Sequence, residues 1–345
     1  MEVSMGWWIG FLAFVVTVLV LDLSVFHRRS HEIGFKEALG WTAFWISLAV
    51  IFNLGILLGW FGNFAPEMRK QAALEFLTGY LVEEALSMDN VFVFAVIFNY
   101  FAVPAMYRHR VLFYGILGAL IFRGIFIFGG LWLLEKFDWM MYVFGGLLIL
   151  TGIRLLWAEE KEIHPERNPV IRLIRRVLPV TPGYVGGSFL VRVDGRLLAT
   201  PLLLVLAFVE TTDILFAVDS IPAIIAITQK SFIVYTSNVF AILGLRALYF
   251  CLANVMKLFH YLSYGLSFLL VVIGAKMLIA AWFHYHLPTA WSLGLVAGIL
   301  AVSIIASVLF PPRDKDGGGI SEEARGKALE ELAESDPPAQ PGNEG

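Results

Sequence analysis

The sequence has little charge for its length. Only 15% of its 345 residues are Asp, Glu, Lys or Arg, while 59% are hydrophobic, and an average soluble domain carries roughly 25% charged residues. This composition excludes an ordinary soluble enzyme and indicates a chain embedded in a lipid bilayer. The small net charge of −3 gives no basic surface for a nucleic acid partner.

Cysteine is almost absent, since Cys251 is the single one. The sequence therefore lacks a disulfide framework, a CxxC redox pair and a thiolate metal cluster. The first residues, MEVSM, carry no basic segment before the apolar run that starts at Trp7. We expect a retained first membrane span there, not a signal peptide.

Long apolar stretches are what the sequence does contain, and nine of them are long enough to cross roughly 30 Å of hydrocarbon. They cover about residues 5–25, 38–61, 72–98, 111–134, 137–157, 201–228, 233–255, 259–283 and 288–310. Basic residues concentrate in alternate connections, as at Arg28, Arg29 and Arg108. The positive-inside rule then places the N-terminus outside and the C-terminus in the cytoplasm, in the cell (inner) membrane. We predict an all-α, polytopic membrane protein with about nine transmembrane helices.

Two acidic motifs reveal an internal repeat. VEEALSMDNVFVF (82–94) aligns with TDILFAVDSIPAI (212–224). The aligned pairs are Glu83 with Asp213, Asp89 with Asp219, Arg123 with Arg246 and Gly152 with Gly274. Spans three to five therefore repeat as spans six to eight. Because the unit has an odd number of spans, the second copy is predicted to be inverted, an arrangement typical of transporters.

This repeat sets the expected organisation of the chain. Residues 1–61 form two N-terminal spans, 62–157 the first three-helix repeat and 158–200 a cytoplasmic linker. The inverted repeat covers 201–283 and the last span 284–310, and an acidic, mostly disordered cytoplasmic tail covers 311–345.

Six carboxylates fall inside the third and sixth spans. They are Glu83, Glu84, Asp89, Glu210, Asp213 and Asp219. Each costs roughly 2.5–3.5 kcal/mol at a helix centre, and the mid-span cations are Arg123 and Arg246, one in each repeat. Protons or bound metal cations have to neutralise the remaining charge, unless the acids only pair with the arginines to stabilise the bundle.

The residue types near these acids indicate which metal would suit them. Carboxylate, amide, hydroxyl and carbonyl oxygens favour Mn²⁺, Mg²⁺ or Ca²⁺ over Cu⁺ and Zn²⁺, and a thioether from Met88 would favour Mn²⁺. Pro222 lacks an N–H group, so we expect a helix break around Val218 to Ser220 that presents carbonyl oxygens beside Asp219.

The motifs EEALSMDNVFVFAVIF and VETTDILFAVDSIPAI resemble those of the TerC family of integral membrane proteins. The size and the nine expected spans are similar to the Alx branch. The resemblance covers about residues 1–310. It implies a relation to the LysE-type transporter superfamily, Mn²⁺ efflux, responses to alkaline pH and metals, and tellurium-ion resistance, and some members are described as membrane-bound redox modulators. The family's acidic motif positions correspond to Glu83, Asp89, Glu210, Asp213 and Asp219.

We therefore predict a transporter, not an enzyme, that exports Mn²⁺ by proton antiport and holds no prosthetic group. The predicted central ligands are Asp89 and Asp219, with Glu83, Asp213 and Glu210 as ligands or proton acceptors. Accessory ligands are expected among Glu84, Met88, Asn90 and Ser220, with Arg123 and Arg246 as counter-ions. Two alternatives stay open: a membrane-bound redox modulator or tellurium-resistance factor, and an exporter of a cationic organic solute.

Overall fold

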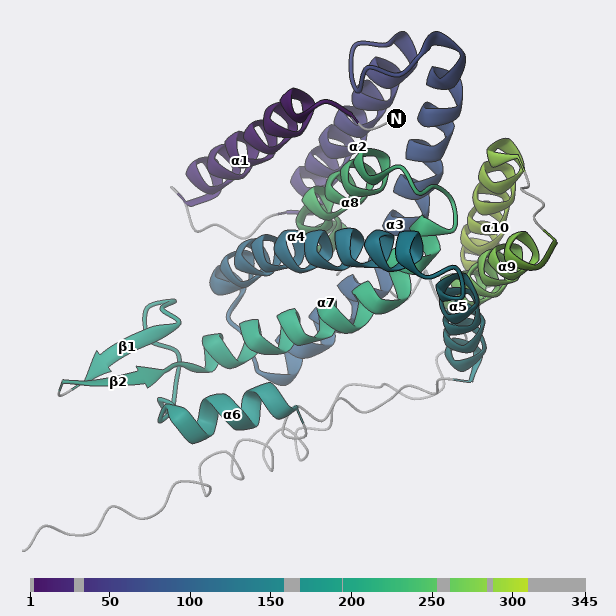
Figure 1. Cartoon of the computed structure of the whole chain (residues 1–345). Helices are drawn as coiled ribbons and strands as arrows, with labels where there is room; N and C mark the ends of the chain where they lie inside the picture. The colour runs from purple at the N-terminus through teal and green to yellow at the C-terminus, as the bar shows by residue number, and fades with distance from the viewer. Residues whose placement is uncertain are drawn as a thin grey trace, which may run out of the picture.

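The computed structural model describes residues 3–27, 34–157, 168–193, 195–252, 261–283 and 288–309 (Figure 1). The described helices before the linker are α1 (Met5–His27), α2 (Phe35–Leu58), α3 (Pro66–Tyr100), α4 (Ala105–Lys136) and α5 (Met140–Leu156). The linker holds α6 (Pro169–Val177), β1 (Leu190–Val193) and β2 (Arg196–Ala199). After it come α7 (Pro201–Ile225), α8 (Ser231–Leu252), α9 (Leu262–Phe283) and α10 (Thr289–Leu309). The predicted disordered tail lies outside the described residues.

Six of the described helices are long and apolar enough to cross a membrane: α2, α4, α7, α8, α9 and α10. The apolar parts of α1 and α5 are shorter, and α3 carries Glu83, Glu84 and Asp89 within its apolar half. The helical, membrane-spanning architecture is confirmed, while the number of nine spans stays a prediction.

Helix boundaries follow local sequence chemistry. Pro66, Pro169 and Pro201 each occupy the first position of a helix, where the missing N–H has no intrahelical partner to lose. At the other end of α2, Gly59 adopts a left-handed conformation with φ of 81°. Its N–H donates to the carbonyl of Ile56 at 3.1 Å, so a conformation that favours glycine terminates this helix.

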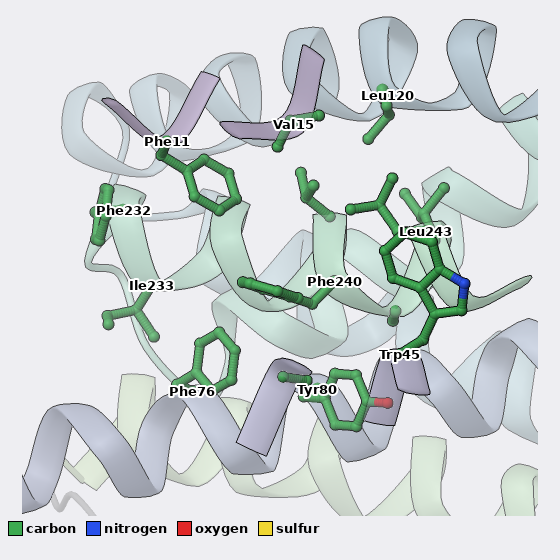
Figure 2. Packing of buried hydrophobic residues seen from close by; sticks show 14 of the residues in the cluster. Phe11, Val15, Trp45, Phe76, Tyr80, Leu120, Phe232, Ile233, Phe240 and Leu243 are labelled. Carbon is green, nitrogen blue, oxygen red and sulfur yellow. The ribbon is translucent and has the colours of Figure 1, made fainter. Parts of the chain in front are cut away.

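Helix α8 is the innermost element of the bundle. In its most apolar 18-residue window 89% of the residues are buried, against 11% for α10. Around it, Phe11 of α1, Trp45 of α2 and Phe76 of α3 converge on Phe240 of α8 (Figure 2). The rings of Phe52 and Phe240 lie 4.8 Å apart. A polar side chain on α8 is therefore surrounded by protein, not by lipid.

Helix α7 runs without interruption from Pro201 to Ile225, with Pro222 inside it. This corrects the predicted helix break around Val218 to Ser220. Proline removes a single N–H donor, and Pro222 lies in the last turn, where few hydrogen bonds remain to be disturbed. Burial of Ser220, Ile221 and Ile224 holds this turn in helical geometry.

The linker has more structure than the expected connection. Helix α6 packs on α7, and β1 pairs with β2 as an antiparallel hairpin in which Leu190 faces Ala199. The described fold is thus helical with one small hairpin, and the all-α prediction missed these two strands. Figure 1 shows α6 and the hairpin beside the start of α7. Residues 158–167 of the linker lie outside the described part.

Candidate cation site

Arg123 is the centre of the buried polar group in the bundle. Its side chain projects from α4 and the residue is only 1% exposed. The guanidinium makes ion pairs with Glu83 of α3 and with Asp213 of α7, where Nη2 lies 3.2 Å from Oδ1. Nη1 also donates to Ser220 Oγ at 3.2 Å. One guanidinium therefore joins two acids that the sequence alignment matched with each other.

Glu83 is fully buried and has two further donors. Ser87 Oγ, one helical turn along α3, donates to Glu83 Oε1 at 3.4 Å. Asn238 Nδ2 of α8 donates to Glu83 Oε2 at 3.0 Å. Helices α3, α4, α7 and α8 thus each supply a side chain to this group, which we call the Arg123 cluster: Arg123, Glu83, Asp213, Ser87, Ser220 and Asn238.

Asn238 was missed by the sequence analysis. A signal was present, because Thr236, Ser237 and Asn238 are three consecutive polar residues in an apolar helix, and all three are buried. Thr236 and Ser237 donate to carbonyls of their own helix, the ordinary way for hydroxyls to be satisfied there. An amide has both donor and acceptor atoms to satisfy, so Asn238 was the one that required a partner from another helix.

Several buried oxygens around this cluster have no hydrogen-bond donor in the described part of the chain. They are Asp213 Oδ2, Asn238 Oδ1, Asn90 Oδ1, Glu84 Oε2 and Glu210 Oε2. Buried polar atoms are normally satisfied. All five of these are acceptors, while Arg123 Nε is a buried donor that also has no partner among the described residues. Because the unpaired acceptors outnumber the one unpaired donor, this region is chemically suited to a cation, a proton or an ordered water.

Glu210 reaches the cluster because α4 carries a glycine opposite it. A methyl group placed on Gly118 would overlap the Glu210 carboxylate, so this side chain lies directly against the α4 backbone. Its charge is near enough to Asp213 for the two to repel. Glu84 bonds to Tyr80, one turn earlier on α3. Glu210 therefore places a further carboxyl group beside Asp213 of the Arg123 cluster.

Asp89 and Asp219 bond to the outer helices α9 and α5. Asp219 Oδ1 accepts from Thr151 Oγ1 of α5 at 2.8 Å, with Arg154 close enough to interact electrostatically. Asp89 bonds to Ser263 of α9. Asp89 and Asp219 are aligned in the repeat, and they bond to α9 and α5, which are also equivalent in the repeat. Neither of these two hydrogen bonds involves Arg123.

The predicted site residues therefore separate into groups. Over the described ranges, no set of three or more His, Cys, Asp and Glu lies together in a way that could hold a metal ion. Asn90 is buried on α3 and Arg246 on α8, while Met88 packs against an apolar cluster. The assignment of Asp89 and Asp219 as central ligands stays a prediction.

A second ionic group lies at the N-terminal half of α3. Glu75 is 3% exposed and accepts from Thr228 Oγ1 at 2.8 Å and from Gln71 Nε2 at 2.9 Å. Lys230 Nζ lies 3.0 Å from Glu75 Oε2. This ion pair joins α3 to the connection between α7 and α8.

Comparison with known proteins places these features in a family. The model of the integral membrane protein TerC family matches residues 68–315. A protein named "Uncharacterized membrane protein STKORF319" from Myxococcus xanthus is 52% identical, over 89% of this chain and 93% of its own. "Putative membrane-bound redox modulator Alx" of Escherichia coli strain K12 is 47% identical, over 90% of this chain and 97% of its own. No solved structure matches. The chain belongs to the TerC family of integral membrane proteins, as its two acidic motifs indicated.

Proposed function

We propose that this membrane protein is a secondary transporter that exports a divalent metal cation, Mn²⁺ foremost, in exchange for protons. The observation that carries the proposal is the surplus of buried acceptors around Arg123. Asp213 Oδ2, Asn90 Oδ1 and Asn238 Oδ1 have no donor within the described chain. Leaving such an atom unsatisfied costs about 1–3 kcal/mol, a penalty that a cation or a proton would remove.

Arg123 is the proposed counter-ion of the substrate-free state. With its guanidinium between Glu83 and Asp213, the three ionised groups carry a net charge of −1. A divalent cation that replaced Arg123 between the two carboxylates would make them neutral, whereas a monovalent cation would not. Protons taken up by the acids would have the same effect after the metal leaves, which makes proton exchange the natural coupling.

We further infer that α3–α5 and α7–α9 are inverted repeats. Helix α3 packs on α8 and α4 packs on α7, while α5 packs on α9, a pattern that is unchanged when the two repeats are exchanged. The alignment offset that matches Gly152 with Gly274 also matches Gly145 with Ser267. A methyl group on Gly145 would meet the Gly274 carbonyl, and one on Gly152 would meet the Ser267 carbonyl. When the two repeats are exchanged, the contact between Gly145 and Gly274 becomes the contact between Ser267 and Gly152, so the two contacts are equivalent.

Such a repeat supports alternating access around the Arg123 cluster, because Glu83 and Asp213 belong to different repeats. Asp89 and Asp219 lie six residues further along their helices, roughly 9 Å away at 1.5 Å per residue. We propose that they bind the cation on its path to or from the cluster, with Glu210 and Glu84 as neighbouring acids. The proposed orientation has the N-terminus outside and the linker in the cytoplasm.

Oxygen ligands support Mn²⁺, Mg²⁺ or Ca²⁺ as substrate, and a thioether from Met88 would favour Mn²⁺. The second candidate function comes from the name of two relatives, "Putative membrane-bound redox modulator Alx". With Cys251 as the single cysteine, direct dithiol chemistry within one chain is excluded. A redox effect would then have to follow indirectly from a change in cellular metal content.

The test is Mn²⁺ uptake into inside-out membrane vesicles that contain the full chain. Asp213→Asn removes a buried charge contact, so we expect uptake to fall at least about tenfold, equivalent to roughly 1.4 kcal/mol. Glu67→Gln, on the exposed first turn of α3, is the matched control and should transport normally.

The same vesicles distinguish the alternatives. Mg²⁺ and Ca²⁺ added in excess rank the metals, and competition by lysine would indicate a cationic organic solute instead. Equal Mn²⁺ uptake by wild type and Asp213→Asn, with both proteins inserted at equal amounts, would refute the proposal.

A further inference from the structure

Helix α6 in the linker has one broad apolar face, and the rest of the protein covers only one side of it. Ile171 is 1% exposed, and Ile174, three residues later, is partly buried. Val170, Leu173 and Val177 are 38%, 59% and 68% exposed. At 100° per residue these three share one face of the helix, beside the face that Ile171 and Ile174 turn toward the protein.

The remaining face of α6 is basic. Arg172, Arg175 and Arg176 are all exposed, and Arg175 lies nearly opposite the direction in which Leu173 and Val177 point. The segment 168–200 holds five arginines and one acid, Asp194. A helix with an apolar face, a strongly basic face and little overall hydrophobicity is typical of the interface between lipid headgroups and acyl chains.

The position of α6 fits that depth. It packs on α7 and lies beside the start of that helix in Figure 1. Helix α7 has 25 residues, or roughly 37 Å at 1.5 Å per residue, against roughly 30 Å of hydrocarbon. The helix is thus longer than the hydrocarbon is thick, and because the arginine-bearing linker precedes it, we place its first turn in the headgroup layer. A helix packed there meets lipid on its uncovered side.

We propose that α6 lies in the headgroup layer of the protein's own bilayer and binds anionic lipids. Val170, Leu173 and Val177 insert beside the acyl chains, Arg172 and Arg176 contact lipid phosphates at the flanks, and Arg175 faces water. The negative charge of the lipid complements the excess of four positive charges in the segment. The linker is thereby fixed against the membrane at the point where the second repeat begins.

The experiment places one fluorescent label at each of two positions in the full chain. In a Cys251→Ser background, Val177→Cys and Arg175→Cys are labelled with an environment-sensitive dye and reconstituted in vesicles. These contain either zwitterionic lipid alone or zwitterionic lipid mixed with phosphatidylglycerol. Nitroxide-labelled lipid, with the spin label high on the acyl chain, quenches probes at the interface, and iodide quenches probes in water.

We expect lipid quenching at position 177 and iodide quenching at position 175, with at least a twofold difference between the positions for each quencher. The lipid quenching at 177 should increase with phosphatidylglycerol and decrease at high salt, since the attraction to anionic lipid is screened. Iodide quenching of both labels to the same extent would overturn the proposal, as that would place α6 in water.

Protection of the 177 label from both quenchers would also overturn it, because the apolar face would then be covered by protein, such as a second copy of this chain. Equal lipid quenching at 177 in both lipid mixtures would refute the specific part of the proposal, the binding of anionic lipid. Transport activity does not enter this readout, so the result is independent of the proposed function.

Discussion

Replacement of Arg123 by methionine tests whether the buried charge cluster stabilises the bundle. The variant keeps the apolar stem but leaves Glu83 and Asp213, which are 0% and 4% exposed, without their shared cation. Removing one partner of a buried ion pair costs about 3–5 kcal/mol, because the remaining charge stays desolvated. At roughly 2 °C per kcal/mol for a large domain, we expect the apparent melting temperature to fall by about 6–10 °C.

The assay is thermal unfolding of the detergent-purified full chain at a fixed scan rate, since such unfolding is often irreversible. Lys70→Met is the control, because Lys70 is exposed near the start of α3 and surface charges contribute about 0–1 kcal/mol. The triple variant Arg123→Met, Glu83→Gln, Asp213→Asn removes the unpaired charges and should recover most of the loss. An unchanged melting temperature for Arg123→Met, or no recovery in the triple variant, would show that this cluster is not held by charge.

Three further outcomes follow from single contacts. Lys230→Met removes the cation that directly contacts Glu75 and leaves the neutral donors Gln71 and Thr228, with Lys276 interacting electrostatically. We expect a loss of about 1–3 kcal/mol in the same melting assay, and Glu75→Gln in addition should restore it. Gly118→Val displaces the Glu210 carboxylate from the α4 backbone and should lower Mn²⁺ uptake, whereas Gly129→Val, where nothing lies within 4 Å, should not; equal uptake by both would contradict a role for Glu210. Burial raises the pKa of Tyr184 from 10.0 to about 12, and its hydroxyl donates to the Phe101 carbonyl at 2.7 Å. The unfolded chain loses this proton at a lower pH than the folded chain does, so the stability from Tyr184 is complete below pH 10 and is lost as the pH rises through 12. Tyr184→Phe should remove that alkaline step from limited proteolysis of the linker, and an identical pH profile in both proteins would assign the step to another group.

The helices and the Glu83–Arg123–Asp213 group were predictable because the physics behind them is local or strongly constrained. Apolar stretches of 20 or more residues have few structures available in a bilayer except helices. A buried acid requires a partner, and few cations were available within the apolar stretches. The alignment of Glu83 with Asp213 also indicated that one site would use both.

The bonding partners of Asp89 and Asp219 could not be predicted from the sequence, because they depend on which way each helix faces. Six residues along a helix turn a side chain by about 120° from its starting face, so these acids leave the face that Glu83 and Asp213 share. The sequence predicted a break before Pro222 that would present carbonyl oxygens beside Asp219. The helix instead continues through the proline, and Asp219 bonds to Thr151 of α5.

Asn238 shows most clearly what sequence reasoning lacked. Three polar residues in a row on a membrane helix can face a neighbouring helix, an aqueous path or the helix backbone, and their spacing does not decide among these. The decisive fact is that α8 is the innermost helix, which depends on the packing of α2, α3 and α4 around it. Once α8 is surrounded, an amide at position 238 has to find its partners inside the protein. Its Nδ2 reaches Glu83, while its Oδ1 has no donor among the described residues. Asn238 therefore holds a carboxylate in place and keeps one oxygen available for the proposed cation. A polar residue on the most buried helix is therefore a better guide to the Arg123 cluster than an acid whose helix face is unknown.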